Sequence, residues 1–109
     1  MNSTNPSTKL ATNLAILANI EAKPQHADDV EALLSGAIEL ANQEAGTTNW
    51  FAFKLSETRF GIFDTFANEE GRQAHLNGDI AKALLGKADE WLSQAPDILM
   101  ADVLAAKLG

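Results

Sequence analysis

Two side chains in the stretch RFGIFDTFANEEGRQAHLNG, residues 59–78, are suited to acid–base chemistry. Asp64 lies in an aromatic-rich apolar run, where burial would raise the pKa of its carboxyl and make it a candidate base. His75 is one of only two histidines in the chain, and an imidazole can transfer protons near neutral pH. Both also have a structural interpretation. Asp64 could accept hydrogen bonds from backbone amides or from Arg72, and His75 could be a packed histidine bonded to a neighbouring loop.

Aromatic side chains concentrate around these two residues. One predicted hairpin, within residues 47–66, holds all five phenylalanines of the chain, namely Phe51, Phe53, Phe60, Phe63 and Phe66. Such a cluster fits an aromatic-lined cavity and an ordinary sheet core equally well. Trp50 could stack on a flat ligand or belong to the core or a dimer interface, and Trp91 has the helical spacing of a core residue. The candidate substrate-binding residues are Trp50, Phe51, Phe53 and Phe66.

Other kinds of site find little support in the sequence. There are no cysteines, which removes thiolate catalysis and thiolate metal sites. His75 and Asp79 have i, i+4 spacing, but Asn77 and Gly78 interrupt the helix between them, and two histidines cannot make a three-His zinc site. The glycines form no phosphate-binding loop, and no serine lies in a nucleophile elbow. We expect no metal.

Composition indicates one domain of an ordinary soluble protein. With 109 residues, 46% of them hydrophobic, the chain can build one core, which we place in residues 10–109 after a disordered tail at residues 1–9. A net charge of −7 without a basic patch argues against nucleic-acid or anionic-membrane partners. No signal-peptide pattern and no run of roughly 20 apolar residues is present, so we expect a cytoplasmic protein.

The elements that must position Asp64 and His75 follow from periodicity. We predict a strand at 12–20, a helix from about 28 to 46, a hairpin of strands 47–55 and 59–66 joined by SETR, and a strand-like run after Pro96. The composition of that last run would also permit a helix. Two helices are expected between the hairpin and the last run. Asn68 is the predicted N-cap of the first, and Asp79 is the predicted N-cap of the second, which follows a break at Asn77 and Gly78.

The order β, α, β, β, α, β predicts a ferredoxin-like α+β fold, a four-stranded antiparallel sheet with helices on one face. Two helical layers cover only one side of such a sheet. The strands are nevertheless apolar on both sides: Ala15 and Leu17 lie opposite Leu14 and Ile16 in the first strand, and Trp50 and Ala52 lie opposite Phe51 and Phe53 in the second. We therefore expect a homodimer formed through the open sheet face.

Residues 13–108 resemble the antibiotic biosynthesis monooxygenase domain, a family within the dimeric α/β-barrel superfamily. Four motifs carry the resemblance: AKP before the first helix, EAGTTNWFAFK leading into the second strand, GIFDTFANEE in the third, and the AHL that follows. The resemblance implies a dimeric α/β barrel with a pocket between helices and sheet in each subunit. It also implies, for some members, oxidation of phenols or quinols without metal, flavin or other cofactor, by deprotonating a substrate that then reduces O2.

The sequence departs from the family pattern near these motifs. Phe66 stands where the family usually has Trp, and Ile80 stands where quinol-oxidising relatives tend to show a second histidine. Asp64 keeps the acidic position, and His75 is the histidine of the AHL motif. The chain has no Tyr, so a Tyr-based proton relay is excluded, and without the Trp a haem-degrading role is disfavoured.

Two functional hypotheses remain. The first is a cofactor-independent monooxygenase acting on a small hydrophobic aromatic or quinol, with Asp64 or His75 as base. The second is a non-catalytic dimeric module that binds a small apolar ligand. Fold does not decide between them, and the sequence names neither a substrate nor a pathway.

Overall fold

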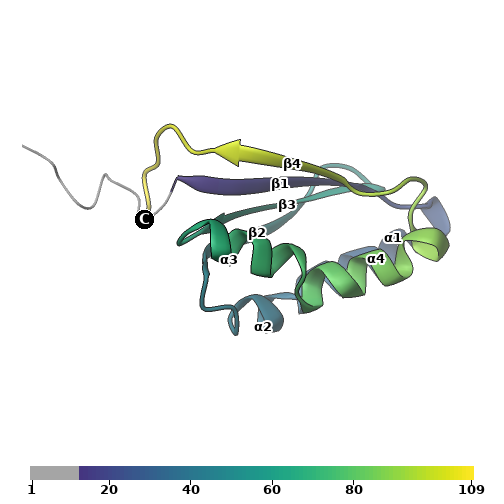
Figure 1. Ribbon diagram of the computed structural model, residues 1–109. Helices are drawn as coiled ribbons and strands as arrows, with labels where there is room; N and C mark the ends of the chain where they lie inside the picture. Colours follow the sequence, from purple (N-terminus) through teal and green to yellow (C-terminus); the bar gives the residue numbers. More distant parts are fainter. Residues whose placement is uncertain (1–12) are drawn as a thin grey trace, which may run out of the picture.

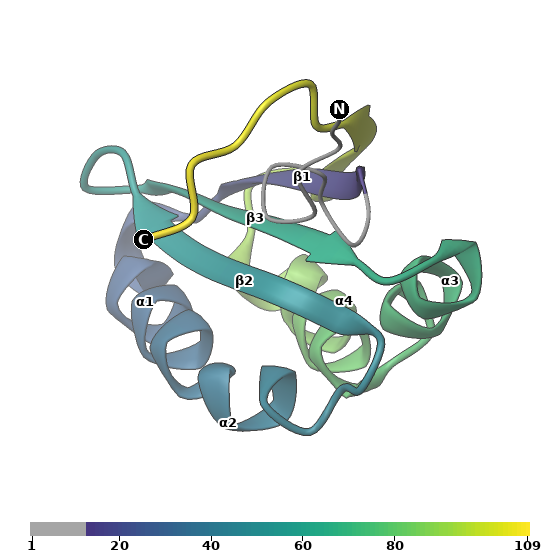
Figure 2. The same cartoon turned by 90° about the vertical axis from the view of Figure 1, so that its left-hand side faces the viewer.

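The computed structural model describes residues 13–109, and the tail predicted at residues 1–9 lies outside this range. The described chain forms one four-stranded antiparallel sheet in the order β2-β3-β1-β4, with its helices on one side, as Figures 1 and 2 show. The strands are β1 (Leu14–Glu21), β2 (Thr47–Lys54), β3 (Arg59–Phe66) and β4 (Asp97–Asp102). The helices are a 3-10 turn (Pro24–His26), α1 (Ala27–Gly36), α2 (Ile38–Ala41), α3 (Glu69–Leu76) and α4 (Asp79–Trp91). The predicted ferredoxin-like fold is confirmed.

Strand register decides which side chains meet the helices. Asp64 of β3 lies opposite Ile16 of β1 and Trp50 of β2, so these three side chains share the helix-covered face. The adjacent residues along each strand point to the opposite side, which we call the open face. Phe51 and Phe63 are register partners there. One strand thus supplies Asp64 to the covered face and Phe63 to the open face.

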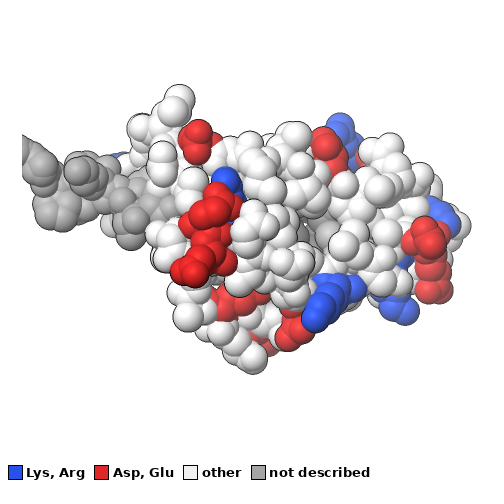
Figure 3. All heavy atoms as spheres, viewed as in Figure 1, with Lys and Arg blue, Asp and Glu red and all other residues white. Residues whose placement is uncertain are grey.

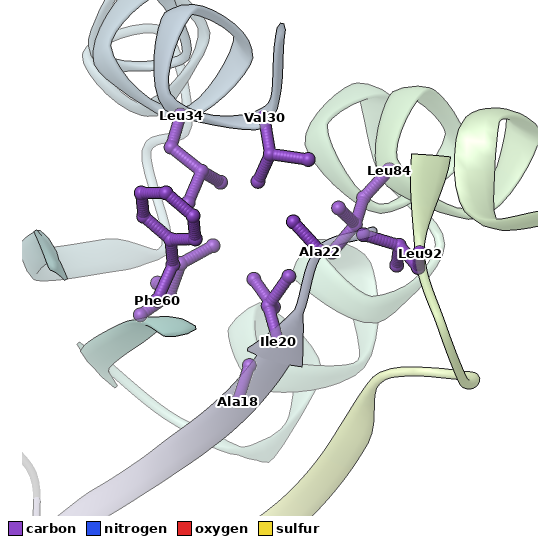
Figure 4. Close-up of a cluster of buried hydrophobic side chains, with 9 residues drawn as sticks. Ala18, Ile20, Ala22, Val30, Leu34, Phe60, Leu84 and Leu92 are labelled. Carbon is purple, nitrogen blue, oxygen red and sulfur yellow. The ribbon is translucent and has the colours of Figure 1, made fainter. Parts of the chain in front are cut away.

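The hydrophobic core fills the space between the sheet and helices α1 and α4. Figure 4 shows β1 and β3 side chains meeting those of the two helices. The buried members shown there are Ala18, Ile20, Ala22, Val30, Leu34, Phe60, Leu84 and Leu92. Full burial of each larger apolar side chain stabilises the fold by roughly 1.5–3 kcal/mol. This cluster fixes the helices against the sheet beside Asp64.

Three boundaries differ from the sequence prediction. The first helix is two pieces, with α1 ending at Gly36 and α2 covering only Ile38–Ala41. Asp79 is the first residue of α4 rather than its cap; Gly78 occupies the N-cap position without a side-chain hydrogen bond, because glycine has none to offer. The run after Pro96 is a strand, but it ends at Asp102. The predicted Asn68 cap is confirmed, since its Oδ1 accepts from the Gly71 amide at 2.8 Å.

The surface is acidic overall, and on the face shown in Figure 3 the Lys and Arg side chains lie apart from one another. Between residues 13 and 109, none of the helices has the length and apolar character needed to span a membrane.

Candidate functional site

Asp64 is a fully buried carboxylate on the covered face. Asp64 as a whole is 0% exposed, and the residues paired with it on the two neighbouring strands are Ile16 and Trp50. Burial raises the pKa of the Asp64 carboxyl, because the ionised form loses its hydration. The contact with His75 acts in the opposite direction and favours the carboxylate, while the charge of Glu44 adds to the increase. The predicted orientation toward the helices is confirmed, and burial raises the pKa in the direction that the apolar surroundings predicted.

His75 lies in the last turn of α3 and is the nearest charged partner of Asp64. Its Nε2 is 2.9 Å from Asp64 Oδ2, an ion-pair distance, although the N–H is not aligned well enough for a hydrogen bond. Both Asp64 oxygens consequently lack an aligned donor among the described residues. The imidazole also packs at 5.1 Å, ring centre to ring centre, against Phe66, tilted by 45°. His75 is therefore a packed histidine that also contacts the candidate base.

Glu44 completes the group and was missed by the sequence analysis. Its Oε1 lies 2.7 Å from His75 Nδ1 and accepts a hydrogen bond from Thr47 Oγ1 at 2.7 Å. The side chain is 19% exposed, against 1% for Asp64. His75 is thus held between a buried carboxylate and one that reaches solvent.

A contact between two glycines brings Glu44 to His75. Gly46, two residues after Glu44, lies directly against Gly71 of α3, and a Cβ on Gly46 would come within 2.7 Å of the Gly71 Cα. The Gly46 carbonyl also accepts from the Ala67 amide at 2.9 Å, which anchors the loop beside the start of α3. A glycine inside a helix costs about 1 kcal/mol relative to alanine, so Gly71 in the helix signals a close approach. That signal could have indicated which loop packs on α3.

The pKa of His75 reflects opposing influences. Burial is the largest single one and lowers the pKa, because it disfavours the charged imidazolium. Asp64 and Glu44 together outweigh burial through their close contacts and negative charges. The net effect raises the pKa of His75 above its usual value of 6.5, so the imidazolium is favoured.

Two cavities meet at His75. The inner cavity, about 50 Å³, lies between sheet and helices and is lined by Asp64 and His75 among apolar side chains such as Ile16, Ile62 and Leu84. The outer hollow, about 270 Å³, lies at the surface and is lined by Glu44, Thr47 and His75 together with Gly46, Gly71 and Asp79. A cavity therefore survives beside Asp64 and His75, and Phe66 does not line it.

The structure divides the four predicted substrate-binding residues between the two faces. Phe66 is fully buried against His75. Trp50 shares the covered face but packs against the core, and its buried Nε1 has no hydrogen-bond acceptor among the described residues. Phe51 and Phe53 point to the open face, where the Phe53 ring covers Gly61. They cannot contact a ligand at Asp64, because successive strand residues point to opposite sides.

The remaining charged candidates have partners elsewhere. Arg72, a predicted alternative partner of Asp64, pairs with Glu69 at 2.6 Å and donates to the Ala15 carbonyl. His26, the second histidine, contacts Asp29 at 2.9 Å and stacks on Trp91, and it does not line the inner cavity. Within residues 13–109, no group of three or more His, Cys, Asp or Glu side chains has a geometry that could hold a metal ion.

Comparisons with known proteins agree with this architecture. No protein-family model matches the chain, and no curated protein matches it. Among solved structures, a Nitrosomonas europaea protein of unknown function is 49% identical over 91% of this chain and 96% of its own, with a TM-score of 0.87. A Pseudomonas aeruginosa protein is 22% identical over 86% and 96%, with a TM-score of 0.75. An antibiotic biosynthesis monooxygenase is 17% identical over 84% and 98%, with a TM-score of 0.73.

Proposed function

We propose that this chain, which belongs with the Nitrosomonas europaea protein and has the fold of antibiotic biosynthesis monooxygenases, is a cofactor-independent monooxygenase. Its substrate would be a small hydrophobic aromatic or a quinol. One observation carries the proposal: a buried carboxylate lies 2.9 Å from an imidazole at the wall of an otherwise apolar cavity. Perturbed titratable pairs of this kind are typical of acid–base sites.

Asp64 is the proposed base. Its carboxylate accepts a proton from an activated C–H or O–H of the substrate, and the resulting anion passes one electron to O2. The substrate radical and superoxide combine to a peroxide anion, which takes the proton back from Asp64. Loss of water then leaves a carbonyl, so that a CH2 group and O2 become a C=O group and H2O. Substrate and O2 balance all atoms and electrons, and the protein supplies a base, orientation and a dry site.

His75 is the proposed electrostatic partner in this reaction. As an imidazolium it favours the ionised form of Asp64, which burial opposes. Its positive charge beside the cavity also favours superoxide and peroxide over neutral O2, since fixed charges act strongly in a site that excludes water. The Phe66 ring packs against the imidazole, tilted by 45°, and fixes its orientation beside Asp64.

The size of the inner cavity sets a condition on the substrate. A volume of about 50 Å³ accommodates O2 or a water molecule, whereas ligand pockets usually measure about 300–1,000 Å³. Binding an aromatic ring therefore has to displace lining side chains. Ile98 on edge strand β4 is 41% exposed and lines this cavity, so we propose that the ring enters past it.

Oxygen consumption with a panel of dihydroxynaphthalenes and anthrones tests the function. Asp64→Asn and His75→Gln should each lower turnover about 10²- to 10⁴-fold, the usual contribution of a positioned acid or base. Asp97→Asn and His26→Gln are matched controls that make the same chemical changes outside the site and should retain turnover. Activity that survives both site substitutions would contradict the assignment.

A second candidate function is favoured by the same small cavity and by Phe66 in place of the family's usual Trp. In this alternative the protein is a non-catalytic dimeric module that binds a small apolar ligand in the inner cavity once the lining side chains have moved. No turnover with any aromatic of the panel, together with binding of one of them at the covered face, would support this alternative.

We also propose that the protein acts as a homodimer through the open face. Phe51 and Leu99 lie on that face and are 54% and 44% exposed, and both belong to a surface without covering helices. Contiguous apolar surface of this kind usually marks an interface, and a second copy of the same face is self-complementary under two-fold symmetry. Light scattering that shows a monomer at micromolar concentration would contradict the dimer.

We further propose that the protein acts in the cytoplasm. The lack of cysteines is consistent with that reducing compartment.

A further inference from the structure

We propose that Glu44 keeps Asp64 in its basic form by holding His75 as the imidazolium, and that this buried pair exchanges protons with solvent through the outer hollow. The inference rests on the proposed function, in which Asp64 is the base. It assigns a positioning role to a residue that does not line the inner cavity.

The three side chains form a continuous row from the interior to the surface. Asp64 Oδ2 lies 2.9 Å from His75 Nε2, and His75 Nδ1 lies 2.7 Å from Glu44 Oε1. The side-chain exposures along this row are 1%, 9% and 19%. The imidazole is therefore the sole link in this row between the buried carboxylate and the solvent-reaching one.

The charges that face His75 all favour its protonated form. Asp64 faces it from β3 and Glu44 from the loop between α2 and β2, and Asp79 at the start of α4 lines the same outer hollow. Arg72, on the same helix as His75, is directed instead to Glu69. Burial of the ring opposes the positive charge, and Glu44 adds a second carboxylate contact that favours it. Glu44 touches His75 and not Asp64, so it favours the arrangement in which His75, rather than Asp64, holds the proton.

The two cavities differ in how they can carry protons. Most side chains around the inner cavity are apolar, which leaves Asp64 and His75 as its ionisable groups. The outer hollow is wider and includes the polar side chains of Gln43, Glu44 and Thr47. A substrate that fills the inner cavity would exclude water from Asp64, yet His75 could still exchange its Nδ1 proton through Glu44. The protonation state would thus be set from the side opposite the substrate.

Nuclear magnetic resonance of ¹⁵N-labelled histidine tests this inference without any substrate. Glu44→Gln keeps the size of the side chain but removes its charge, and the apparent pKa of His75 should fall, with its acid dissociation constant rising about tenfold or more. Glu44→Asp should restore part of the shift. Glu69→Gln removes a carboxylate from α3 that contacts Arg72 rather than His75, and it should leave the His75 titration unchanged.

A rescue experiment tests the route through the hollow. Glu44→Ala opens space there, and added formate should raise the pKa of His75 again, because a small carboxylate can reach Nδ1 from solvent. The same concentration of chloride is the control for ionic strength. Should Glu44→Ala fail to fold, Glu44→Gln and Glu44→Asp carry the test alone, and an unchanged His75 titration in both would overturn the inference.

Turnover supplies the second readout. In Glu44→Gln the alkaline limb of the pH–rate profile, which reports loss of the imidazolium, should move to lower pH. The acidic limb, which reports ionisation of Asp64, should not move to higher pH, because the charge of Glu44 raises the pKa of Asp64. A uniform loss at every pH would indicate a merely structural role and contradict the inference. If no aromatic is turned over, the proposed function fails, while the histidine titration still decides whether Glu44 sets the charge of His75.

Discussion

The covered and open faces of the sheet use the same strands for different purposes. On the covered face, β3 presents Asp64 and Phe66, both 0% exposed, to the helices. On the open face, β2 presents Phe51, which is 54% exposed, and β4 presents Leu99. The covered face thus buries a charge within a completed core, whereas the open face leaves large apolar side chains at the surface.

Under the proposed function, alternation along a strand would separate chemistry from association. A buried carboxylate needs neighbours that stay fixed, and helices α3 and α4 provide them. An association surface needs only apolar area, which Phe51, Phe63 and Leu99 supply without help from the helices. Because a shift of one residue in register would exchange the two sets, register is what keeps them apart.

Truncating one phenylalanine on each face gives the largest contrast. Phe66→Ala should lower the free energy of unfolding by about 3–5 kcal/mol, because it leaves a cavity in a closed core beside His75. Phe51→Ala should lower the free energy of unfolding of the monomer by only about 0.5 kcal/mol, since the Phe51 side chain is half exposed. Its main effect should be on association. Urea unfolding measures the first quantity and concentration-dependent light scattering the second.

The contrast fails if Phe51→Ala destabilises the monomer as much as Phe66→Ala does. It is sharpened if Phe51→Ala weakens dimerisation while its unfolding at low protein concentration stays close to that of the unmodified chain.

A second contrast concerns the glycines that support the covered face. Gly71→Ala should lower the free energy of unfolding by about 1–3 kcal/mol, because its Cβ would lie 2.9 Å from the Gly46 carbonyl oxygen in a packed contact. Gly86→Ala is the matched control in α4, where a new Cβ meets nothing within 4 Å. That change should stabilise the chain by about 0.5–1 kcal/mol through helix propensity. Thermal unfolding of both variants measures the difference.

Equal effects of the two glycine substitutions would show that the close approach at Gly46 does not constrain the loop. If the contact does constrain it, Gly71→Ala should also move Glu44 away from His75 and lower the pKa of His75 in the same titration.

Much of the fold could be predicted from the sequence, because its signals are local. Apolar alternation and hairpin spacing predicted β1, β2 and β3, and Asn68 predicted the start of α3, whereas the run after Pro96 was left open between strand and helix. The first helix was predicted too long, since the apolar stripe continues through Ala37 and Ala41 although the helix is broken between Gly36 and Ile38. Periodicity does not reveal a break that leaves the buried stripe in place.

The site was predictable only in part. The parity of Asp64 placed it on the covered face, and the apolar run around it predicted its raised pKa. Glu44 was missed because it lies 31 positions before His75, and only the meeting of Gly46 with Gly71 brings the two together. Phe51 and Phe53 were grouped with Phe66 by type, although their parity in register places them on the open face.

The smallest predicted difference between the two faces is in the pH dependence of the free energy of unfolding. In the folded chain the pKa values of Asp64 and His75 are both raised. Each group therefore binds more protons in the folded state than in the unfolded state as pH rises from its unfolded pKa, 3.8 for Asp64 and 6.5 for His75, through its folded pKa. The stability that His75 contributes is fully present below pH 6.5 and is lost as pH rises through its folded pKa. The free energy of unfolding should thus decrease above pH 6.5, by at most about 1.4 kcal/mol per pH unit for one proton. His75→Gln should remove this slope, whereas Phe51→Ala should retain it, because the open face has no part in the charge of the imidazole. Urea titrations between pH 6 and 9 measure the slopes, and a slope that persists in His75→Gln would assign the proton to another group.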